Sequence, residues 1–229
     1  MIPVAHLKAL LTVTRPFGRF LLIVLTLLSF FTCRKDEGCR PQDLGSEQSR
    51  YYVLNIRGNN SSPGLTFLPM TIHQQTTEYS CGPSAVVTLL GYYGRAADEM
   101  QIATEMGTST TCGTNPAQMA GWLSTNGFEA SWHENGSLEM LQAELAQQTP
   151  VLVEWSDWGG HWVLVVGYDT RGTSQTSDDV IIFADPYDRH DDNIDGLSWF
   201  NAERFYYMWY DALLFDRVMR RVYIKANPL

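Results

Sequence analysis

The sequence has few cysteines, few basic residues and no apolar run long enough to cross a membrane. Its four cysteines, at positions 33, 39, 81 and 112 of 229 residues, exclude a small domain held by a dense disulfide framework. Lys and Arg together number 16 against 25 Asp and Glu, a formal net charge of −9. Because such a surface repels phosphate backbones, we expect no nucleic-acid partner. There is no internal repeat, and 45% of the residues are hydrophobic, so a well-filled globular domain is expected.

The first 32 residues have the layout of a signal peptide. The apolar run Phe20–Phe31 follows basic residues and is shorter than the roughly 20 residues of a spanning helix. An uncleaved transmembrane anchor is the alternative. The next residues, CRKDEGCR from Cys33, resemble the start of mature bacterial lipoproteins, in which the cysteine is lipidated. This resemblance implies an exported lipoprotein of the cell envelope, in the periplasm or on the cell surface, anchored in the membrane at Cys33.

The rest of the chain divides into a tether and one domain. Residues 33–50 are polar and charged, which is typical of a linker, and the folded domain is predicted over residues 51–229. Apolar spacing predicts four helices in its first part: 83–93, 96–106, one between Asn115 and Gly127, and one from Ser137 to Pro150. Strands are expected at 51–56, 151–155, 161–169, 180–185 and 220–226, with a helix at 201–209. This order predicts an α+β fold with N-terminal helices packed on a C-terminal antiparallel sheet.

Cys81 lies directly before the helix predicted at residues 83–93, with Gly82 and Pro83 in the turn and first helical position. A thiol at a helix N-terminus is near the positive end of the helix dipole, which favours the thiolate. A free cysteine is also commonly a buried core residue. Position alone therefore leaves both interpretations open.

His161 and Asp185 supply the partners that a nucleophilic cysteine needs. His161 begins one predicted strand after two glycines, and Asp185 ends the next strand. If these strands form an antiparallel hairpin, the start of the first lies beside the end of the second. Asp185 would then orient the imidazole that takes the thiol proton. Gln75, six residues before Cys81, is placed to donate a hydrogen bond to an oxyanion, and Gln74 is its competitor.

Three stretches, QTTEYSCGPSA, GGHWVLVVGYD and FADPY, resemble in order and spacing the peptidase C39-like branch of the papain-like cysteine peptidases. The resemblance implies a papain-like fold and a peptide or protein substrate. It makes Cys81 the nucleophile, His161 the general base and acid, Asp185 the orienting residue and Gln75 the oxyanion donor. The best-known C39 members are exporter domains that cut leader peptides after a double glycine. They have an acid directly before the cysteine, where this chain has Ser80.

We therefore expect an exported, lipid-anchored cysteine peptidase that hydrolyses peptide bonds through a Cys-His-Asp triad and a thioester intermediate. Two alternatives stay open. One is a catalytically silent surface module of the same fold that binds peptides or glycans, and the other is an acyl or peptidyl transferase that uses the same triad.

Other features of the sequence add smaller expectations. The acidic stretch DPYDRHDDNIDG does not match a calcium-binding loop and is expected to be solvated, and no cofactor or metal is expected. A disulfide between Cys39 and Cys112 is as plausible as two unpaired thiols. Trp155, Trp158 and Trp162 surround the turn before His161, where they line either a substrate cleft or the core.

Overall fold

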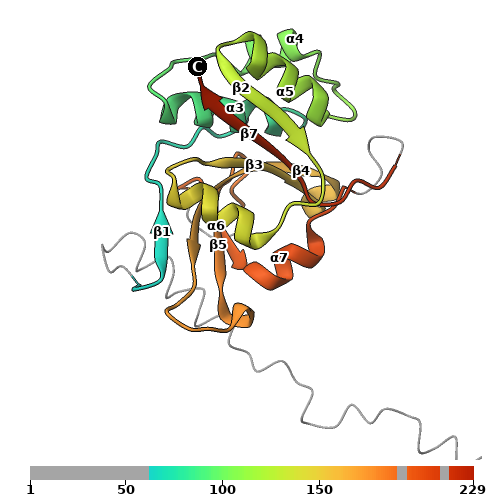
Figure 1. The fold of residues 1–229 in the computed structure, drawn as a ribbon. Helices are drawn as coiled ribbons and strands as arrows, with labels where there is room; N and C mark the ends of the chain where they lie inside the picture. The colour runs from blue at the N-terminus through green and yellow to red at the C-terminus, as the bar shows by residue number, and fades with distance from the viewer. Residues whose placement is uncertain (1–61, 190–194, 212–216) are drawn as a thin grey trace, which may run out of the picture. The chain divides into compact units, whose positions relative to one another are not determined.

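The structure, a computed structural model, describes residues 62–189, 195–211 and 217–229 (Figure 1). The chain divides into Met1–Val53 and Leu54–Leu229, and every described residue belongs to the second unit. The predicted signal peptide, the tether with Cys33 and Cys39, and the strand predicted at 51–56 lie outside the described residues. No helix in the described ranges is long and apolar enough to span a membrane.

An antiparallel sheet of seven strands forms the centre of the fold, in the order β2-β7-β3-β4-β5-β6, with β1 paired to β4. The strands are β1 (Leu65–Phe67), β2 (Phe128–His133), β3 (Val151–Trp155), β4 (His161–Asp169), β5 (Val180–Ala184), β6 (Leu197–Asn201) and β7 (Val222–Pro228). The strands β3, β4 and β5 are buried along their whole length. Their β-branched and aromatic residues suit central strands covered on both faces.

Five α-helices lie in the described part of the chain. They are α3 (Cys81–Tyr92), α4 (Glu99–Met106), α5 (Pro116–Thr125), α6 (Leu138–Ala146) and α7 (Ala202–Met208), with short 3₁₀ turns η3 (Asp157–Gly159) and η4 (Thr176–Asp178). The start of α5 is fixed by a capping box. Asn115 Oδ1 accepts from Gln118 N, and Gln118 Oε1 accepts from Asn115 N, each at 2.9 Å. Pro116 takes the first helical position, where its missing N–H costs nothing.

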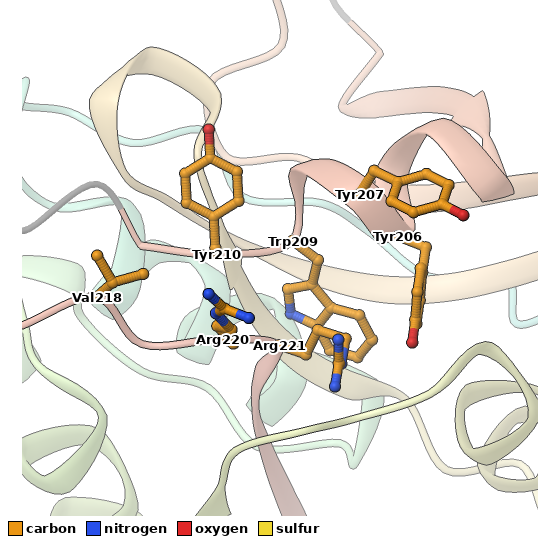
Figure 2. A pocket seen from close by; sticks show the side chains of 7 residues that line it. All are labelled: Tyr206, Tyr207, Trp209, Tyr210, Val218, Arg220 and Arg221. Atoms are coloured by element: carbon orange, nitrogen blue, oxygen red, sulfur yellow. The ribbon is translucent and has the colours of Figure 1, made fainter.

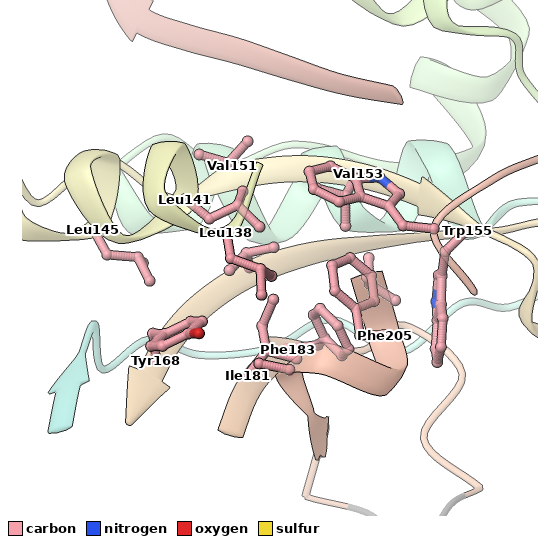
Figure 3. Close-up of a cluster of buried hydrophobic side chains, with 14 of the residues drawn as sticks. Leu138, Leu141, Leu145, Val151, Val153, Trp155, Tyr168, Ile181, Phe183 and Phe205 are labelled. Atoms are coloured by element: carbon pink, nitrogen blue, oxygen red, sulfur yellow. The ribbon is translucent and has the colours of Figure 1, made fainter. Parts of the chain in front are cut away.

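One apolar cluster holds α6 and α7 against β3, β4 and β5 (Figure 3). Trp155 packs against three aromatic rings there, with ring centroids 5.6 Å from Phe183, 4.8 Å from Phe200 and 5.5 Å from Phe205. Trp155 is also the cross-strand partner of His161. The aromatic packing therefore fixes the end of the sheet at which β4 begins.

The α+β class and the antiparallel sheet are confirmed, but the order of helices first and strands second was too simple. The segments β1, β2 and β6 were not predicted. In β2 only alternate residues are buried or half-buried, as in an edge strand, and the pattern FEASWH was overlooked between two strong helices. The last strand, β7, lies between β2 and β3. The first helix also begins at Cys81 and not at Pro83.

Candidate active site

Cys81 is the first residue of α3 and is partly exposed. The next residue, Gly82, allows a close approach of this helix to the chain before α5. A Cβ atom at Gly82 would lie 3.1 Å from Met119 Sδ and 3.2 Å from Thr114 Cβ. The packing beside the N-terminus of α3 therefore leaves little room for a side chain at position 82.

The pairing of β4 with β5 brings His161 and Asp185 together. Leu164 is paired with Ala184, so the start of β4 lies beside the end of β5, as the sequence predicted. His161 Nε2 and Asp185 Oδ1 are 2.8 Å apart, and both side chains are only 4% exposed. Because Asp185 engages Nε2, Nδ1 is the ring nitrogen that remains for Cys81.

Asp185 is held as a carboxylate by two further donors. The backbone N–H of Tyr187 donates to Oδ1 at 2.9 Å, and the hydroxyl of Ser198 donates to Oδ2 at 2.8 Å. Burial would raise the pKa of Asp185, but the hydrogen bond and charge of His161, together with these two donors, lower it. Ser198 lies on β6, a strand that was not predicted, so no sequence signal pointed to it.

The pKa shifts of Cys81 and His161 have opposite signs. Burial would raise the pKa of Cys81, but the hydrogen bond and charge of His161 and the N–H groups of Trp162 and Gly82 lower it below 9.0. Burial would lower the pKa of His161, but Asp185 and Cys81 raise it to about 10. The two groups titrate as a coupled pair. The arrangement therefore favours a thiolate beside an imidazolium at neutral pH.

Gln75 lies in the loop before α3, where its backbone N–H donates to Pro186 O at 2.8 Å. Its side-chain amide donates to Thr77 O at 2.7 Å, which uses one of its two N–H groups. Gln74 makes different contacts, since its side chain donates to Asp185 O at 2.7 Å and accepts from Asp188 N at 3.2 Å. The two glutamines tie the loop before Cys81 to the segment that carries Asp185.

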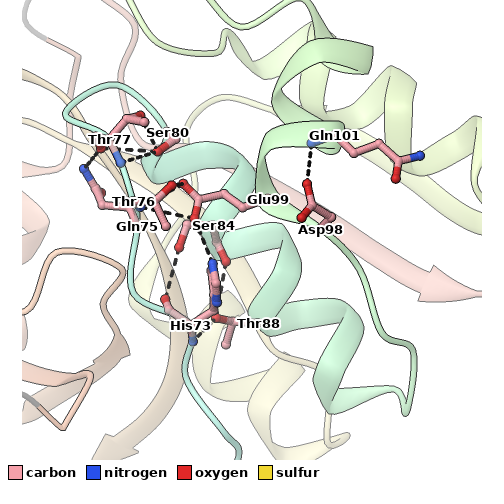
Figure 4. Close-up of polar contacts among 10 residues, drawn as sticks. All are labelled: His73, Gln75, Thr76, Thr77, Ser80, Ser84, Thr88, Asp98, Glu99 and Gln101. Atoms are coloured by element: carbon pink, nitrogen blue, oxygen red, sulfur yellow. Dashed lines mark hydrogen bonds and ion pairs between the residues drawn. The ribbon is translucent and has the colours of Figure 1, made fainter.

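Glu99 is a residue that the sequence analysis missed. It lies in the first turn of α4, is only 4% exposed, and reaches into the loop before Cys81 (Figure 4). Its carboxylate accepts from Thr76 N at 3.0 Å and Thr76 Oγ1 at 3.1 Å, and lies 2.8 Å from His73 Nε2. Burial would raise the pKa of Glu99, but hydrogen bonds from Ser80, Thr76 and His73 lower it. An ionised carboxylate thus lies beside Ser80, although the residue directly before Cys81 in the sequence is not an acid.

Glu154 is a second missed residue, only 1% exposed and next to the last residue of β3. It is paired with Trp162 on β4 and with Val222 on β7. Its Oε2 atom has no hydrogen-bond partner among the described residues. Burial, with smaller contributions from Asp211 and Cys81, raises the pKa of Glu154 to about 9, so this carboxyl is neutral at pH 7. Glu154 could have been noticed in the sequence because it is the one glutamate within the apolar run VLVEW.

The three tryptophans near His161 have different positions. Trp155 and Trp162 are 0% and 2% exposed, and the indole of Trp162 donates to Thr114 O at 2.8 Å, so both belong to the core. Trp158 is 64% exposed, with a positive φ of 52°. Its ring lies edge-on to Tyr187, with centroids 5.4 Å apart. Trp158 and Tyr187 therefore flank the His161–Asp185 pair at the surface.

The expectation of a solvated acidic stretch was wrong for its first part. Asp188 is fully buried and its Oδ2 accepts from Asp195 N at 3.0 Å and Gly196 N at 2.8 Å. It therefore closes the loop after Asp185, of which residues 190–194 lie outside the described ranges. Within those ranges no group of three His, Cys, Asp or Glu side chains could hold a metal ion. Cys112 is an exposed thiol.

Comparisons with known proteins give the family. Residues 67–212 match the Peptidase_C39 like family, and the chain belongs to this family. Among solved structures, the peptidase domain of Streptococcus ComA, a bifunctional ABC transporter involved in a quorum sensing pathway, has 17% identity and a TM-score of 0.50, covering 69% of this chain and 98% of its own. A C39-like peptidase from Bacillus anthracis has 16% identity and a TM-score of 0.49, covering 70% and 94%. The curated proteins contain no match. The fold is that of C39 peptidase domains, which is papain-like.

The coupled titration predicts how Cys81 reacts with iodoacetamide. Alkylation of the wild-type thiol should persist well below pH 9 because the pKa of Cys81 is lowered. In His161→Ala, burial still raises the pKa of Cys81, but the hydrogen bond and charge of His161 no longer lower it. The alkylation rate of Cys81 at pH 6.5 should therefore fall about tenfold or more. Peptide mass mapping over a pH series measures the rate at each cysteine. Exposed Cys112 serves as the internal control, and an unchanged pH profile of Cys81 in the variant would contradict the coupling.

The raised pKa of Glu154 predicts that the free energy of unfolding depends on pH. Its pKa rises from 4.5 to about 9 on folding, so the folded chain binds one more proton than the unfolded chain between these values. Stability contributed by the protonated group is complete below pH 4.5 and is lost as pH rises toward 9, by about 1.4 kcal/mol per pH unit. Glu154→Gln should remove this slope between pH 5.5 and 8.5 in urea unfolding, whereas exposed Glu203→Gln should retain it. Equal slopes in all three proteins would show that Glu154 is ionised.

Proposed function

We propose that this protein is an exported, lipid-anchored cysteine peptidase that hydrolyses peptide bonds at Cys81. The observation that carries the proposal is the buried His161 Nε2–Asp185 Oδ1 hydrogen bond of 2.8 Å, coupled to a thiol at the first residue of α3. Three residues separated by 80 and 24 positions in the chain meet at one end of the sheet. Membership of the Peptidase_C39 like family supports the same chemistry.

The proposed reaction begins with the Cys81 thiolate and the His161 imidazolium. The thiolate attacks the carbonyl carbon of a peptide bond, and His161 donates its Nδ1 proton to the leaving amine, which leaves a thioester on Cys81. Neutral His161 then takes a proton from water, the resulting hydroxide attacks the thioester, and the carboxylic acid product leaves the thiolate restored. Asp185 keeps the ring in the tautomer and orientation that both steps require.

We assign stabilisation of the oxyanion to the backbone N–H at the start of α3 and to the side-chain amide of Gln75. The backbone N–H of Cys81 belongs to the first turn of the helix, where N–H groups have no intrahelical acceptor. Gln75 keeps one amide N–H after its bond to Thr77. Glu99 stabilises the loop that carries Gln75 through its bonds to Thr76. We assign Glu99 the role of a positioning residue for the oxyanion donor.

A peptide or protein is the proposed substrate. Exposed Trp158 and half-buried Tyr187 supply an apolar edge to the site. Trp158 keeps a backbone conformation that is unfavourable for a large side chain, and such strain persists where surrounding structure maintains it, often at functional sites. Aromatic rings at this edge suit apolar side chains of a peptide.

Paired cysteine variants test the proposed activity. Wild-type protein and the variants Cys81→Ser and Cys112→Ser are incubated with a peptide library digested from a bacterial proteome, and new termini are identified by mass spectrometry. Cys81→Ser should lose cleavage by about a thousandfold or more, and Cys112→Ser should retain it, because Cys112 is exposed and lies outside the triad. Cleavage that survives in Cys81→Ser would overturn the proposal. Products that carry an added amine in place of a new carboxyl terminus would indicate a transferase.

The proposed anchor is tested at Cys33. The full chain with its N-terminus should fractionate with membranes and carry a mass increment of acyl groups on Cys33. One acylated cysteine with two or more chains gives stable anchoring, because each buried methylene contributes about 0.8 kcal/mol. Cys33→Ser should lose the acyl increment, and Cys39→Ser should keep it. A membrane-bound wild-type protein that carries no acyl increment and retains its N-terminal residues would support an uncleaved transmembrane segment and contradict the lipid anchor.

A further inference from the structure

A hollow of about 380 Å³ lies between α7 and the start of β7 (Figure 2). Its walls include Tyr206, Tyr207, Tyr210, Arg220 and Arg221, and we call it the tyrosine–arginine hollow. Its size falls in the range of small-molecule and side-chain sites, about 300–1,000 Å³. None of these residues belongs to the candidate triad, so the hollow needs an explanation of its own.

The two arginines of the tyrosine–arginine hollow have the opposite sign to the net charge of the chain, which is −9. Elsewhere Arg217 is paired with Glu134 and Lys225 with Glu144. Within the described ranges no carboxylate is paired with Arg220 or Arg221, and no acid lines the hollow. Two guanidinium groups that have no carboxylate partner among the described residues favour an anion, above all a carboxylate, which accepts two parallel hydrogen bonds from arginine.

Aromatic rings complete the chemistry of the hollow. Arg221 lies over the ring of Tyr206, 5.0 Å from its centroid. Tyr207 is 71% exposed and Tyr210 39% exposed, so two large rings face solvent beside the guanidinium groups. Exposed apolar surface gathered around a hollow is typical of a binding site. The combination suits a carboxylate that has an apolar group next to it.

The backbone holds Arg221 in a costly conformation. Its φ is 51°, a left-handed value that is unfavourable for a side chain of this size. Two hydrogen bonds maintain it: Arg221 N donates to Trp209 O at 2.8 Å, and Gly136 N donates to Arg221 O at 3.0 Å. The backbone from which the Arg221 side chain extends is therefore fixed before any ligand arrives.

The hollow and the triad lie at the same end of the sheet. The strand β7 begins at Val222, which is paired with Glu154 on β3, and the next residue of β3, Trp155, is paired with His161 on β4. Val222 and Trp162, the chain neighbours of Arg221 and His161, are both paired with Glu154 and are therefore two strand spacings apart, about 10 Å. An extended peptide rises about 3.3 Å per residue and covers this distance in about three residues.

We infer that the tyrosine–arginine hollow binds an acidic side chain of the peptide substrate, flanked by an apolar residue, about three residues from the bond that is cleaved. This inference rests on the proposed peptidase function. A peptide is favoured over an acidic sugar because one extended chain reaches both the hollow and His161. The hollow would thus select substrates by a contact remote from Cys81.

Binding is measured apart from catalysis, with full-length Cys81→Ser protein and isothermal calorimetry. The probes are acetyl-Phe-Glu-amide, its neutral twin acetyl-Phe-Gln-amide, and galacturonic acid. We expect the Glu peptide to bind at least fivefold more tightly than the Gln twin, and Arg220→Gln to abolish this difference. Exposed Arg204→Gln on α7, outside the hollow, should leave it unchanged. Equal melting temperatures of the variants show that they are folded.

The outcomes separate this inference from the proposed function. Equal affinity for the two peptides, no effect of Arg220→Gln, or tighter binding of galacturonic acid than of the Glu peptide would each overturn the acidic-peptide site. In the active protein, a peptide cleaved in the Cys81 assay should lose at least fivefold in kcat/KM when its acidic residue is changed to Gln. If wild-type protein cleaves nothing, the peptidase proposal fails, and the calorimetry still decides what the hollow binds.

Discussion

The site depends on one buried hydrogen bond, between His161 Nε2 and Asp185 Oδ1 at 2.8 Å. This bond exists because β4 begins where the antiparallel strand β5 ends, and it leaves Nδ1 of the imidazole for Cys81. Asp185 in turn accepts from Tyr187 and Ser198, which keeps its charge in a place that water hardly reaches. A buried charge of this kind is tolerated only when it is paired and hydrogen-bonded. The thiolate–imidazolium pair therefore depends on the sheet register.

The buried glutamates near this bond are arranged so that little negative charge opposes the Cys81 thiolate. Glu154, close enough to influence Cys81, is neutral at pH 7 because burial raises its pKa to about 9. Glu99, which is ionised, is turned toward Thr76 and His73 in the loop before α3. It brings a carboxylate beside Ser80, the residue directly before Cys81.

Much of this arrangement could be predicted from the sequence, and the failures have physical causes. The strands 151–155 and 161–169 were predicted correctly because continuous β-branched runs are strong signals of central strands. The edge strand β2 was missed because its pattern is only half apolar. Glu99 and Ser198 could not be found because each contacts residues more than ten positions away, through packing that no local pattern encodes. The role of Gln74 in fixing Asp185 was missed for the same reason.

The central claim is that Cys81 and His161 form an ion pair, and nitrogen-15 NMR of the His161 ring tests it most directly. Wild-type protein should show both ring nitrogens protonated at pH 7, with loss of the imidazolium only near pH 10. In Cys81→Ala the midpoint should fall, because the thiolate no longer stabilises the cation. A neutral His161 at pH 7 in the wild-type protein, or the same midpoint in both proteins, would contradict the account.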